Sequence, residues 1–272
     1  MAGARVSNFE DMNVATNTVN TKKNGVISPY FGLIHEINKE YSIYASYSDI
    51  FNPQSYRNAE GGHLKPVVGA NYEVGIKGEL LNRQLNVAAA VFRLKQTNLP
   101  RLDESVAYDA SNACGGSCYI AADKVISQGI DLNVSGEIGA GWNIMAGYTF
   151  VHSKYASGTQ GGQRYGTQIP RHSVRLATTY KLPGTSWTIG GNLTAYDKVY
   201  VEGVLSGNSY TIRQSEFALV GLMAKYQISP QSELSFSVSN LFDRTYRAYL
   251  ENRDYSPFGE SRKMAINLKY RF

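Results

Sequence analysis

The sequence contains no long apolar run. No window of about 20 residues, the length of a transmembrane helix, is continuously hydrophobic. A helical membrane span is therefore excluded. Strands are not excluded, because only every second residue of a membrane-spanning strand has to be apolar. Hydrophobic residues make up 43% of the chain, which is enough apolar surface for an ordered structure.

Several functional signals are also missing. The net charge of +5 is modest and the basic residues are scattered, so we predict no nucleic-acid partner. The first residues, Met1–Asn8, have neither the basic segment nor the apolar core of a secretory signal. The sequence has no G-x-S-x-G, P-loop, G-x-G-x-x-G or H-E-x-x-H motif. Amphipathic helix periodicity is absent as well, so we predict that the chain consists of strands.

The most informative stretch is the last ten residues, where apolar and polar side chains alternate with the period of a strand. One face carries Met264, Ile266, Leu268, Tyr270 and Phe272. The other carries Lys263, Ala265, Asn267, Lys269 and Arg271. A strand of a water-soluble sandwich could alternate in the same way. A final strand that ends on an aromatic residue is typical of outer-membrane β-barrels, whose apolar side chains face lipid and whose aromatics lie at the interface.

Segments with the same alternation recur along the chain and predict about twelve strands, each near the length that crosses a bilayer at a tilt. They are Ala2–Phe9, Pro29–Ile37, Tyr41–Ile50, Gly69–Leu80, Leu85–Thr97, Lys124–Ile138, Trp142–Ser153, His172–Leu182, Ser186–Asp197, Gln214–Ile228, Ser232–Asn240 and Ser261–Phe272.

The connections between these strands alternate strictly between short turns and long loops. The long ones are Glu10–Ile27, Phe51–Pro66, Asn98–Ala122, Lys154–Ile169, Lys198–Arg213 and Leu241–Glu260. Outer-membrane barrels have short periplasmic turns and long external loops. We therefore predict an all-β fold, a transmembrane antiparallel up-and-down β-barrel of about twelve strands, with the long loops outside.

Three passages resemble a known family. They are Tyr41–Ser55, Gly69–Glu79, and Ser239–Tyr246 together with the terminal Tyr270-Arg271-Phe272. In this order they resemble the C-terminal half of TonB-dependent siderophore receptors, closest to the group that takes up ferric coprogen, rhodotorulic acid and pyoverdine. In that family a barrel of about 22 strands encloses a plug domain. The signal peptide, TonB box, plug and about ten strands of that architecture have no counterpart here. We therefore expect residues 1–272 to be the C-terminal portion of a receptor barrel.

The resemblance implies a function and a set of partners. The expected function is TonB-dependent uptake of a ferric, hydroxamate-type siderophore by a monomeric, non-enzymatic receptor in the Gram-negative outer membrane. The expected partners are the siderophore, outer-membrane lipid, TonB and the plug domain through the N-terminal region, and the barrel-insertion machinery through the last strand. We expect no cofactor, because iron enters only as part of the siderophore.

The two cysteines, Cys114 and Cys118, lie in a predicted external loop and flank Gly115-Gly116-Ser117. Two cysteines at this spacing can close a small disulfide in an oxidising compartment. A metal site would need further ligands, and none of the four histidines is near in sequence. We predict a disulfide that staples the loop, and no metal site.

Aromatic and arginine side chains are frequent in the predicted external loops. They can pack on a ferric siderophore and hydrogen-bond its oxygens, although each one could also be an ordinary interfacial tyrosine or solvated arginine. The candidate ligand-binding residues are Tyr56, Arg57, His63, Tyr108, Arg164, Tyr165, Tyr200, Tyr210, Arg213, Tyr249, Arg253 and Tyr255.

Two further sets of residues have expected roles. Polar residues on the lumen side could contact a plug, or could line a solvated channel: Asp131, Glu137, Lys263, Lys269 and Arg271. The terminal strand resembles the signal that the outer-membrane insertion machinery reads in such barrels. We therefore assign Tyr270 and Phe272 to barrel assembly.

Two alternative functions stay open from the sequence. A self-contained barrel of twelve strands could act as a channel or a secretion pore, which would require the first and last strands to pair. An outer-membrane hydrolase is conceivable because His152 and Ser153 lie near the end of a predicted strand, although one adjacent pair of this kind is expected by chance.

Overall fold

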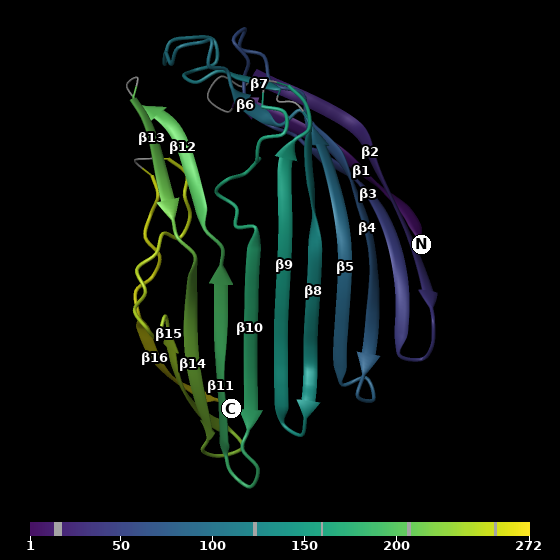
Figure 1. Ribbon diagram of the computed structural model, residues 1–272, viewed down its shortest axis with the longest axis vertical. Coiled ribbons are helices and arrows are strands. Elements are labelled where there is room, and N and C mark those ends of the chain that lie inside the picture. The colour runs from purple at the N-terminus through teal and green to yellow at the C-terminus, as the bar shows by residue number, and fades with distance from the viewer. Residues whose placement is uncertain (14–17, 122–123, 159, 206–207, 253–254) are drawn as a thin grey trace.

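The described part of the chain consists of strands and the connections between them. The computed structural model describes residues 1–13, 18–121, 124–158, 160–205, 208–252 and 255–272. Within these ranges all named elements are strands (Figure 1). No helix in these ranges is long and apolar enough to cross a membrane.

Twelve strands form one antiparallel sheet, in which each strand pairs with the next along the chain. They are β1 (Ala2–Asn13), β2 (Thr18–Glu36), β3 (Tyr41–Asn52), β4 (Val67–Leu80), β5 (Leu85–Thr97), β8 (Val125–Gly139), β9 (Trp142–Tyr155), β10 (His172–Lys181), β11 (Trp187–Tyr196), β14 (Phe217–Gln227), β15 (Ser232–Ser239) and β16 (Lys263–Tyr270). This arrangement confirms the predicted all-β up-and-down fold and its strand number.

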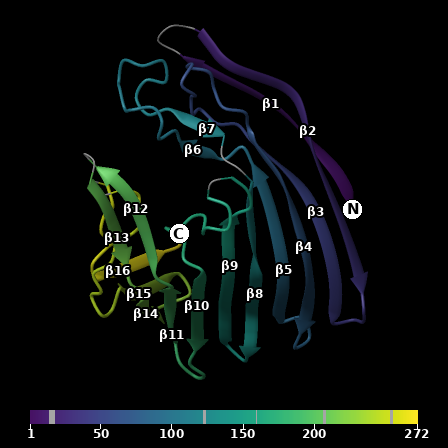
Figure 2. The same ribbon diagram turned by 45° about the horizontal axis from the view of Figure 1, so that its top comes forward.

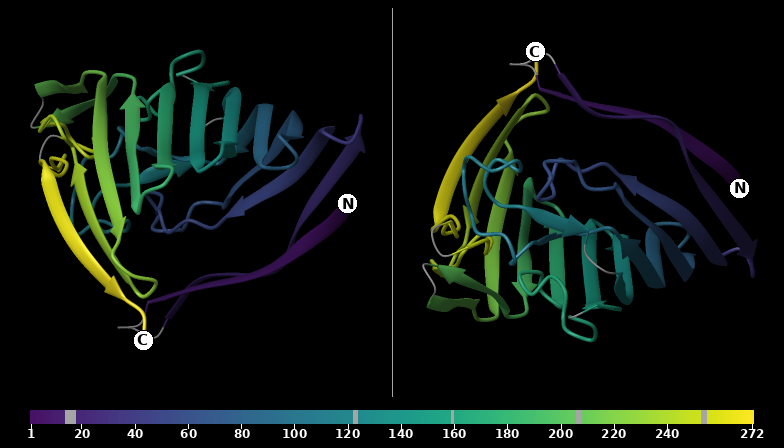
Figure 3. Two further views of the ribbon diagram at one scale, coloured as in Figure 1. Left: turned by 90° about the horizontal axis from the view of Figure 1, so that it is seen from below. Right: turned by 90° about the horizontal axis from the view of Figure 1, so that it is seen from above.

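The sheet curves into a wall (Figure 3). Its outermost strands are β1 and β16, and no pairing between them occurs among the residues that the structure describes. A self-contained barrel would need that pairing, because an open edge leaves a row of unpaired backbone groups. The sheet therefore has the geometry of one part of a barrel wall.

The connections divide between the two ends of the sheet as predicted. Short turns lie at one end, the turn end, and the long connections gather at the other, the loop end (Figure 1). Two of the long connections contain hairpins that the sequence did not predict: β6 (Pro100–Leu102) with β7 (Tyr119–Ala121), and β12 (Val199–Leu205) with β13 (Asn208–Gln214). The long connections are thus partly ordered extensions of the wall.

The prediction of a loop over Glu10–Ile27 is wrong for most of that range. Strands β1 and β2 continue through it, and Glu10 pairs in register with Lys22. The Lys22 ammonium lies 2.5 Å from the Glu10 carboxylate, and opposite charges on facing strand positions stabilise a pair of strands. The polar composition therefore reflects a hairpin that projects beyond the apolar part of the wall, not an irregular loop.

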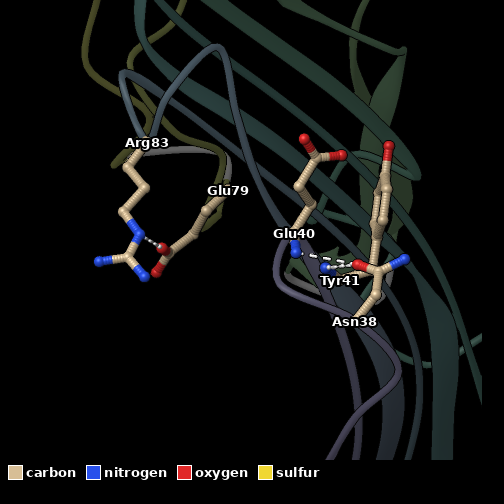
Figure 4. Close-up of polar contacts among 5 residues, drawn as sticks. All are labelled: Asn38, Glu40, Tyr41, Glu79 and Arg83. Carbon is tan, nitrogen blue, oxygen red and sulfur yellow. Dashed lines mark hydrogen bonds and ion pairs between the residues drawn. The ribbon is translucent and has the colours of Figure 1, made fainter.

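Local contacts close the turns at the turn end (Figure 4). After β2, the side-chain oxygen of Asn38 accepts hydrogen bonds from the backbone N–H groups of Glu40 and Tyr41, both at 2.9 Å. After β4, the Arg83 guanidinium lies 3.4 Å from the Glu79 carboxylate. The turn at Asn38 needs only a few residues because its own side chain satisfies the backbone groups.

The register separates the side chains into two faces. Val74, Val91 and Ile130 are successive cross-strand partners, so they share one face, which we call the outer face. Asp131 and Thr149 are partners on the opposite, inner face. Val74 and Val91 are more than half exposed although they lie in the middle of the sheet. A continuous exposed apolar face requires a non-aqueous covering, which a lipid bilayer provides.

Glycine and tyrosine form a repeated cross-strand pair. In each case the tyrosine ring lies over the glycine of the neighbouring strand, in the space that a Cβ atom would take. The pairs are Tyr30 on Gly3, Tyr44 on Gly75, Tyr41 on Gly78 and Tyr210 on Gly203. Aromatic cover of a strand glycine restores the packing that the missing side chain does not supply. The pairing accounts for part of the high content of both residues.

We predict that Gly75→Val destabilises the sheet by about 1 to 3 kcal/mol, the usual range for overpacking. A Cβ atom at Gly75 would lie 2.6 Å from the Tyr44 ring and 2.7 Å from the Ala89 carbonyl oxygen. The matched control is Gly32→Val, because the nearest atom to a Cβ there is 3.9 Å away. Urea unfolding in lipid vesicles measures both variants. Equal stabilities would contradict the proposed role of the tyrosine cover.

Candidate functional site

The inner face is a polar wall on which side chains of neighbouring strands are joined by hydrogen bonds. Ser153 donates to the Ser127 hydroxyl at 2.7 Å, and Thr149 donates to the Asp131 carboxylate at 3.3 Å. The long connection between β5 and β8 folds inward over this face at the loop end (Figures 2 and 3). The inner face and the loops above it therefore enclose the candidate site.

Four tyrosines gather where the inward-folded loops meet the inner face. Tyr56 and Tyr119 have ring centroids 4.5 Å apart, and Tyr155 and Tyr165 have centroids 5.3 Å apart at an interplanar angle of 89°. We call these four residues the tyrosine cluster. Its base is a small apolar core made of Val67, Leu99 and Val125, against which Tyr155 and Tyr165 pack.

The phenol groups of Tyr165 and Tyr119 are hydrogen-bond donors at neutral pH. Burial raises the pKa of Tyr165 above its ordinary value, and the nearby Tyr155 and Tyr56 raise it further. Burial also raises the pKa of Tyr119 in the β6–β7 hairpin, and Tyr56 adds to this effect. Protonated phenols on rigid rings can donate hydrogen bonds to an oxygen-rich ligand while their faces contact its apolar parts.

The cluster contains two predicted ligand residues and two that the sequence analysis missed. Tyr56 and Tyr165 were predicted, whereas Tyr119 and Tyr155 were not. Tyr155 ends β9 and was counted inside a predicted loop, and Tyr119 follows the second cysteine. Their common signal is position: each is an aromatic residue directly at a strand end near the loop end.

A second group of predicted residues lies on the β12–β13 hairpin. Tyr200 and Arg213 are cross-strand partners, and Tyr210 is the partner of Gly203. The guanidinium carbon of Arg164 lies 6.0 Å from the centroid of the Tyr200 ring, within the range of a cation–π contact. The structure thus joins Arg164, Tyr200 and Arg213 into one aromatic and basic patch.

Three further predicted residues lie in the loops around these groups. His63 is almost buried and its ring lies 3.7 Å from the Asp11 carboxylate, so it links the β3–β4 connection to β1. Arg57 is the backbone-bridge partner of His63. Tyr108 is 74% exposed, and its ring lies near Gly116. The Arg57 carbonyl also accepts a hydrogen bond from the Tyr119 N–H at 2.8 Å, which ties the β3–β4 connection to the tyrosine cluster.

Tyr249 and Tyr255 form a pair in the connection between β15 and β16. Their ring centroids are 5.9 Å apart, and the hydrogen bond with Tyr255 raises the pKa of Tyr249 to about 12. Arg253, predicted to act with them, lies outside the described residues. Both tyrosines are exposed, so they are accessible to a ligand.

The loop that holds both cysteines is stapled by local bonds. The structure joins Cys114 to Cys118 in a disulfide, with their Cα atoms 5.4 Å apart. Asn112 donates to the Gly116 carbonyl at 2.7 Å and accepts from the Gly116 N–H at 3.0 Å. Hydrogen bonds from Ser111 hold the pKa of Asp109 below its ordinary value. Among the described residues, no group of three or more His, Cys, Asp or Glu is placed to hold a metal ion.

The charged residues predicted to face the lumen differ from one another in their contacts. Asp131 accepts the hydrogen bond from Thr149, and Glu137 accepts one from the Gly141 N–H at 2.7 Å, which ties it to a turn. On β16, Lys269 is the cross-strand partner of Glu233, and Lys263 and Arg271 share its face. On the opposite face, the rings of Tyr270 and Phe272 lie 5.1 Å apart. Both rings are exposed.

The geometry does not join His152 to Ser153. The two residues are neighbours in β9, so their side chains point to opposite faces of the sheet. The Ser153 hydroxyl instead bonds Ser127 on the inner face. A nucleophile and its base must be within hydrogen-bonding reach of each other, so this pair does not form a hydrolase site.

The motif around Asn240 closes the connection between β15 and β16. The Asn240 side chain is buried and donates to the carbonyls of Arg244 at 2.9 Å and Glu260 at 3.0 Å. Its oxygen accepts the Arg244 N–H at 2.8 Å. Asp243 accepts the Arg262 N–H at 2.8 Å. These bonds bring both ends of the long connection together, so this motif has a structural role.

Comparisons with known proteins agree with this architecture. A family model for the β-barrel of TonB-dependent receptor-like proteins matches residues 1–241. The ferric-pyoverdine 358 receptor of Pseudomonas putida is 34% identical over 251 residues, which cover 91% of this chain and 29% of that receptor. The ferripyoverdine receptor of Pseudomonas aeruginosa is 32% identical over 260 residues, covering 92% of this chain and 31% of the receptor.

A solved receptor structure also matches this chain. The pyoverdine outer-membrane receptor of Pseudomonas aeruginosa, bound to pyoverdine, matches with a TM-score of 0.86 and 30% identity. The match covers 100% of this chain and 39% of that receptor chain. The chain thus spans about a third of the length of the curated relatives that it matches.

We predict that Asn240→Asp destabilises the protein by about 2 kcal/mol, because two buried carbonyls lose their donor while the side-chain oxygen is retained. Asn240 has a φ of 47°, so the matched control is Asn240→Gly, which keeps the backbone conformation and loses all three bonds. Thermal unfolding and proteolysis of residues 241–262 measure the effect. If Asp and Gly variants both match the wild type, the proposed role of the side chain is wrong.

Proposed function

The chain belongs to the family of TonB-dependent receptor-like β-barrels, and we propose that it forms the C-terminal part of the barrel of a ferric-siderophore receptor. It is an outer-membrane barrel chain, and it is not an enzyme, as predicted, because its relatives are receptors. In the proposed receptor the turn end faces the periplasm and the loop end faces the exterior. Uptake through it would depend on TonB and on a plug domain held against the inner face.

The proposal of a siderophore receptor rests mainly on the tyrosine cluster. A ligand that arrives from outside meets the loops first and then the inner face. The cluster lies at the junction of the two and combines rigid aromatic faces with phenol donors. These groups fit a ferric complex, which has apolar surfaces and many oxygen acceptors. The patch around Tyr200 and Arg213 adds positive charge for an anionic ligand.

The relatives refine the expected ligand class. Those quoted above are named for pyoverdine, whereas the sequence analysis predicted a hydroxamate-type siderophore. We therefore propose a ferric, pyoverdine-like siderophore as the ligand, and the hydroxamate class stays a prediction. Iron belongs to this ligand as cargo, since siderophore receptors carry no cofactor of their own.

The alternative function, an independent channel, predicts a different ion conductance from that of a receptor. A channel formed by this wall alone would conduct ions in a planar bilayer without any siderophore. A receptor would instead take up radiolabelled iron as its siderophore complex, and a protonophore that collapses the inner-membrane gradient would stop the uptake but leave binding unchanged.

We predict that changing both Tyr56 and Tyr119 to Phe weakens ferric-siderophore binding about tenfold, because two hydrogen-bond donors are lost while the rings remain. The measurement is equilibrium binding of ferric pyoverdine, with a ferric trihydroxamate in parallel, to outer-membrane vesicles that contain the protein. The control replaces Tyr180 and Tyr226 by Phe, which lie on the outer face near the turn end. Unchanged affinity in the variant at Tyr56 and Tyr119 would show that the tyrosine cluster does not bind the siderophore.

A further inference from the structure

Tyr56 and Tyr119 of the tyrosine cluster belong to two different long connections, and neither lies on the twelve-stranded sheet. Tyr56 starts a small hairpin, residues 56–64, in which its carbonyl accepts the Leu64 N–H at 2.9 Å. We call this segment the Tyr56 hairpin. Tyr119 starts β7, which pairs with β6 over only three residues. Isolated hairpins are marginally stable, so the two rings depend on contacts between the connections to stay 4.5 Å apart.

The two connections meet at two points of the Tyr56 hairpin. At its stem, the Tyr119 N–H donates to the Arg57 carbonyl at 2.8 Å. At its tip, Gly61 lies against Ala113, and a Cβ atom at Gly61 would be 2.9 Å from the Ala113 carbonyl oxygen. Gly61 also has a φ of 81°, a conformation that glycine adopts without strain. Glycine at the tip therefore permits the close approach of the two connections.

The disulfide joins the residues that adjoin these two contacts. Cys114 follows Ala113, and Cys118 precedes Tyr119. The bond therefore limits how far the tip contact and the stem contact can separate. Cys118 is 1% exposed, so the bond is packed inside the loop. Without it, residues 114–118, which include two glycines, would form a flexible link, and ordering the longer free loop would cost more conformational entropy.

From this arrangement we propose that Cys114 and Cys118 are positioning residues of the ligand site, whose disulfide holds the Tyr119 phenol beside Tyr56 for a hydrogen bond to the ferric ligand. The disulfide acts through Tyr119 alone. Tyr165 has a separate support, because its N–H donates to the carbonyl of Ser153 on β9 at 3.0 Å. The inference rests on the proposed function and deepens it: the affinity of the site depends on a covalent bond outside it.

The test is a double-mutant cycle between the disulfide and each of two tyrosines. The disulfide is removed by changing Cys114 and Cys118 to Ala, which places no polar group at the buried Cys118 position. Tyr119→Phe and Tyr165→Phe are each made in the wild type and in the variant without the disulfide. Equilibrium binding of ferric pyoverdine to outer-membrane vesicles that contain the protein measures all six affinities.

We expect loss of the disulfide to weaken binding about tenfold, because the Tyr119 phenol and ring are both displaced. Tyr119→Phe should weaken binding of the wild type about threefold and have no further effect without the disulfide. Tyr165→Phe should have the same effect in both backgrounds. If Tyr119→Phe weakens binding equally in both backgrounds, the disulfide does not act through Tyr119 and the proposal is wrong.

A second variant perturbs the same arrangement while the disulfide stays intact. Gly61→Ala should separate the two connections at the tip and also weaken ferric-pyoverdine binding about tenfold. The matched control is Gly184→Ala at the turn end, where φ is 68° and no other atom lies within 4 Å of the added Cβ. The control should bind as the wild type does. Wild-type affinity in the Gly61 variant would contradict the role of the tip contact.

Hydrogen exchange of the ligand-free proteins separates this inference from the proposed function. The Tyr119 N–H, bonded to the Arg57 carbonyl, should exchange faster without the disulfide, whereas the N–H groups of β9 should not change. Unchanged exchange at Tyr119 would overturn the positioning role whatever ligand binds. If β9 also exchanges faster, the wall itself is disturbed and the Gly61→Ala variant decides. Faster exchange at Tyr119 in a protein whose wild type binds no siderophore would contradict the proposed function alone.

Discussion

The structure depends on backbone hydrogen bonding in a place without water. Inside a bilayer every N–H and C=O group must find a protein partner, since each unsatisfied group costs several kcal/mol. The antiparallel ladder meets this requirement through the middle of the sheet: between β4 and β5 it runs without a register shift from Val68–Thr97 to Leu80–Leu85. Among the described residues, the outer edges of β1 and β16 have no strand partner in the sheet. In the larger barrel that we propose, further strands pair with both edges.

Once the ladder is fixed, the parity of a residue within its strand decides what its side chain can do. On β9, His152 and Lys154 face outward, whereas Ser153 and Tyr155 face the inner wall. The same four-residue stretch therefore contributes to the outer face and to the tyrosine cluster. A slip of one residue would exchange these roles and turn polar residues such as Thr149 toward the apolar zone. The register is thus as important for the function of this wall as the identity of its residues.

The strands were predictable because alternation is a local property, and the contacts of the site were not because they are long-range. The sequence placed the strands of the sheet correctly in number and order. It failed at Glu10–Ile27, where opposite charges on facing strands extend a hairpin that looked like a polar loop. It also could not bring Tyr119 to Tyr56 or Tyr165 to Tyr155, since these pairs depend on how separate loops fold over the inner face.

The need to pair every backbone group inside the bilayer also explains how the fold persists while the sequence diverges. A relative that shares only 30% of its residues with this chain has nearly the same wall, with a TM-score of 0.86. A strand in lipid demands alternation, hydrogen-bond pairing and interfacial aromatics, and many sequences satisfy these demands. Tightly specified positions are those where a side chain replaces backbone pairing, such as Asn240, or fills a neighbour's space, such as Tyr44 over Gly75. Between such positions, the loops can change their ligand contacts without disturbing the ladder that supports them.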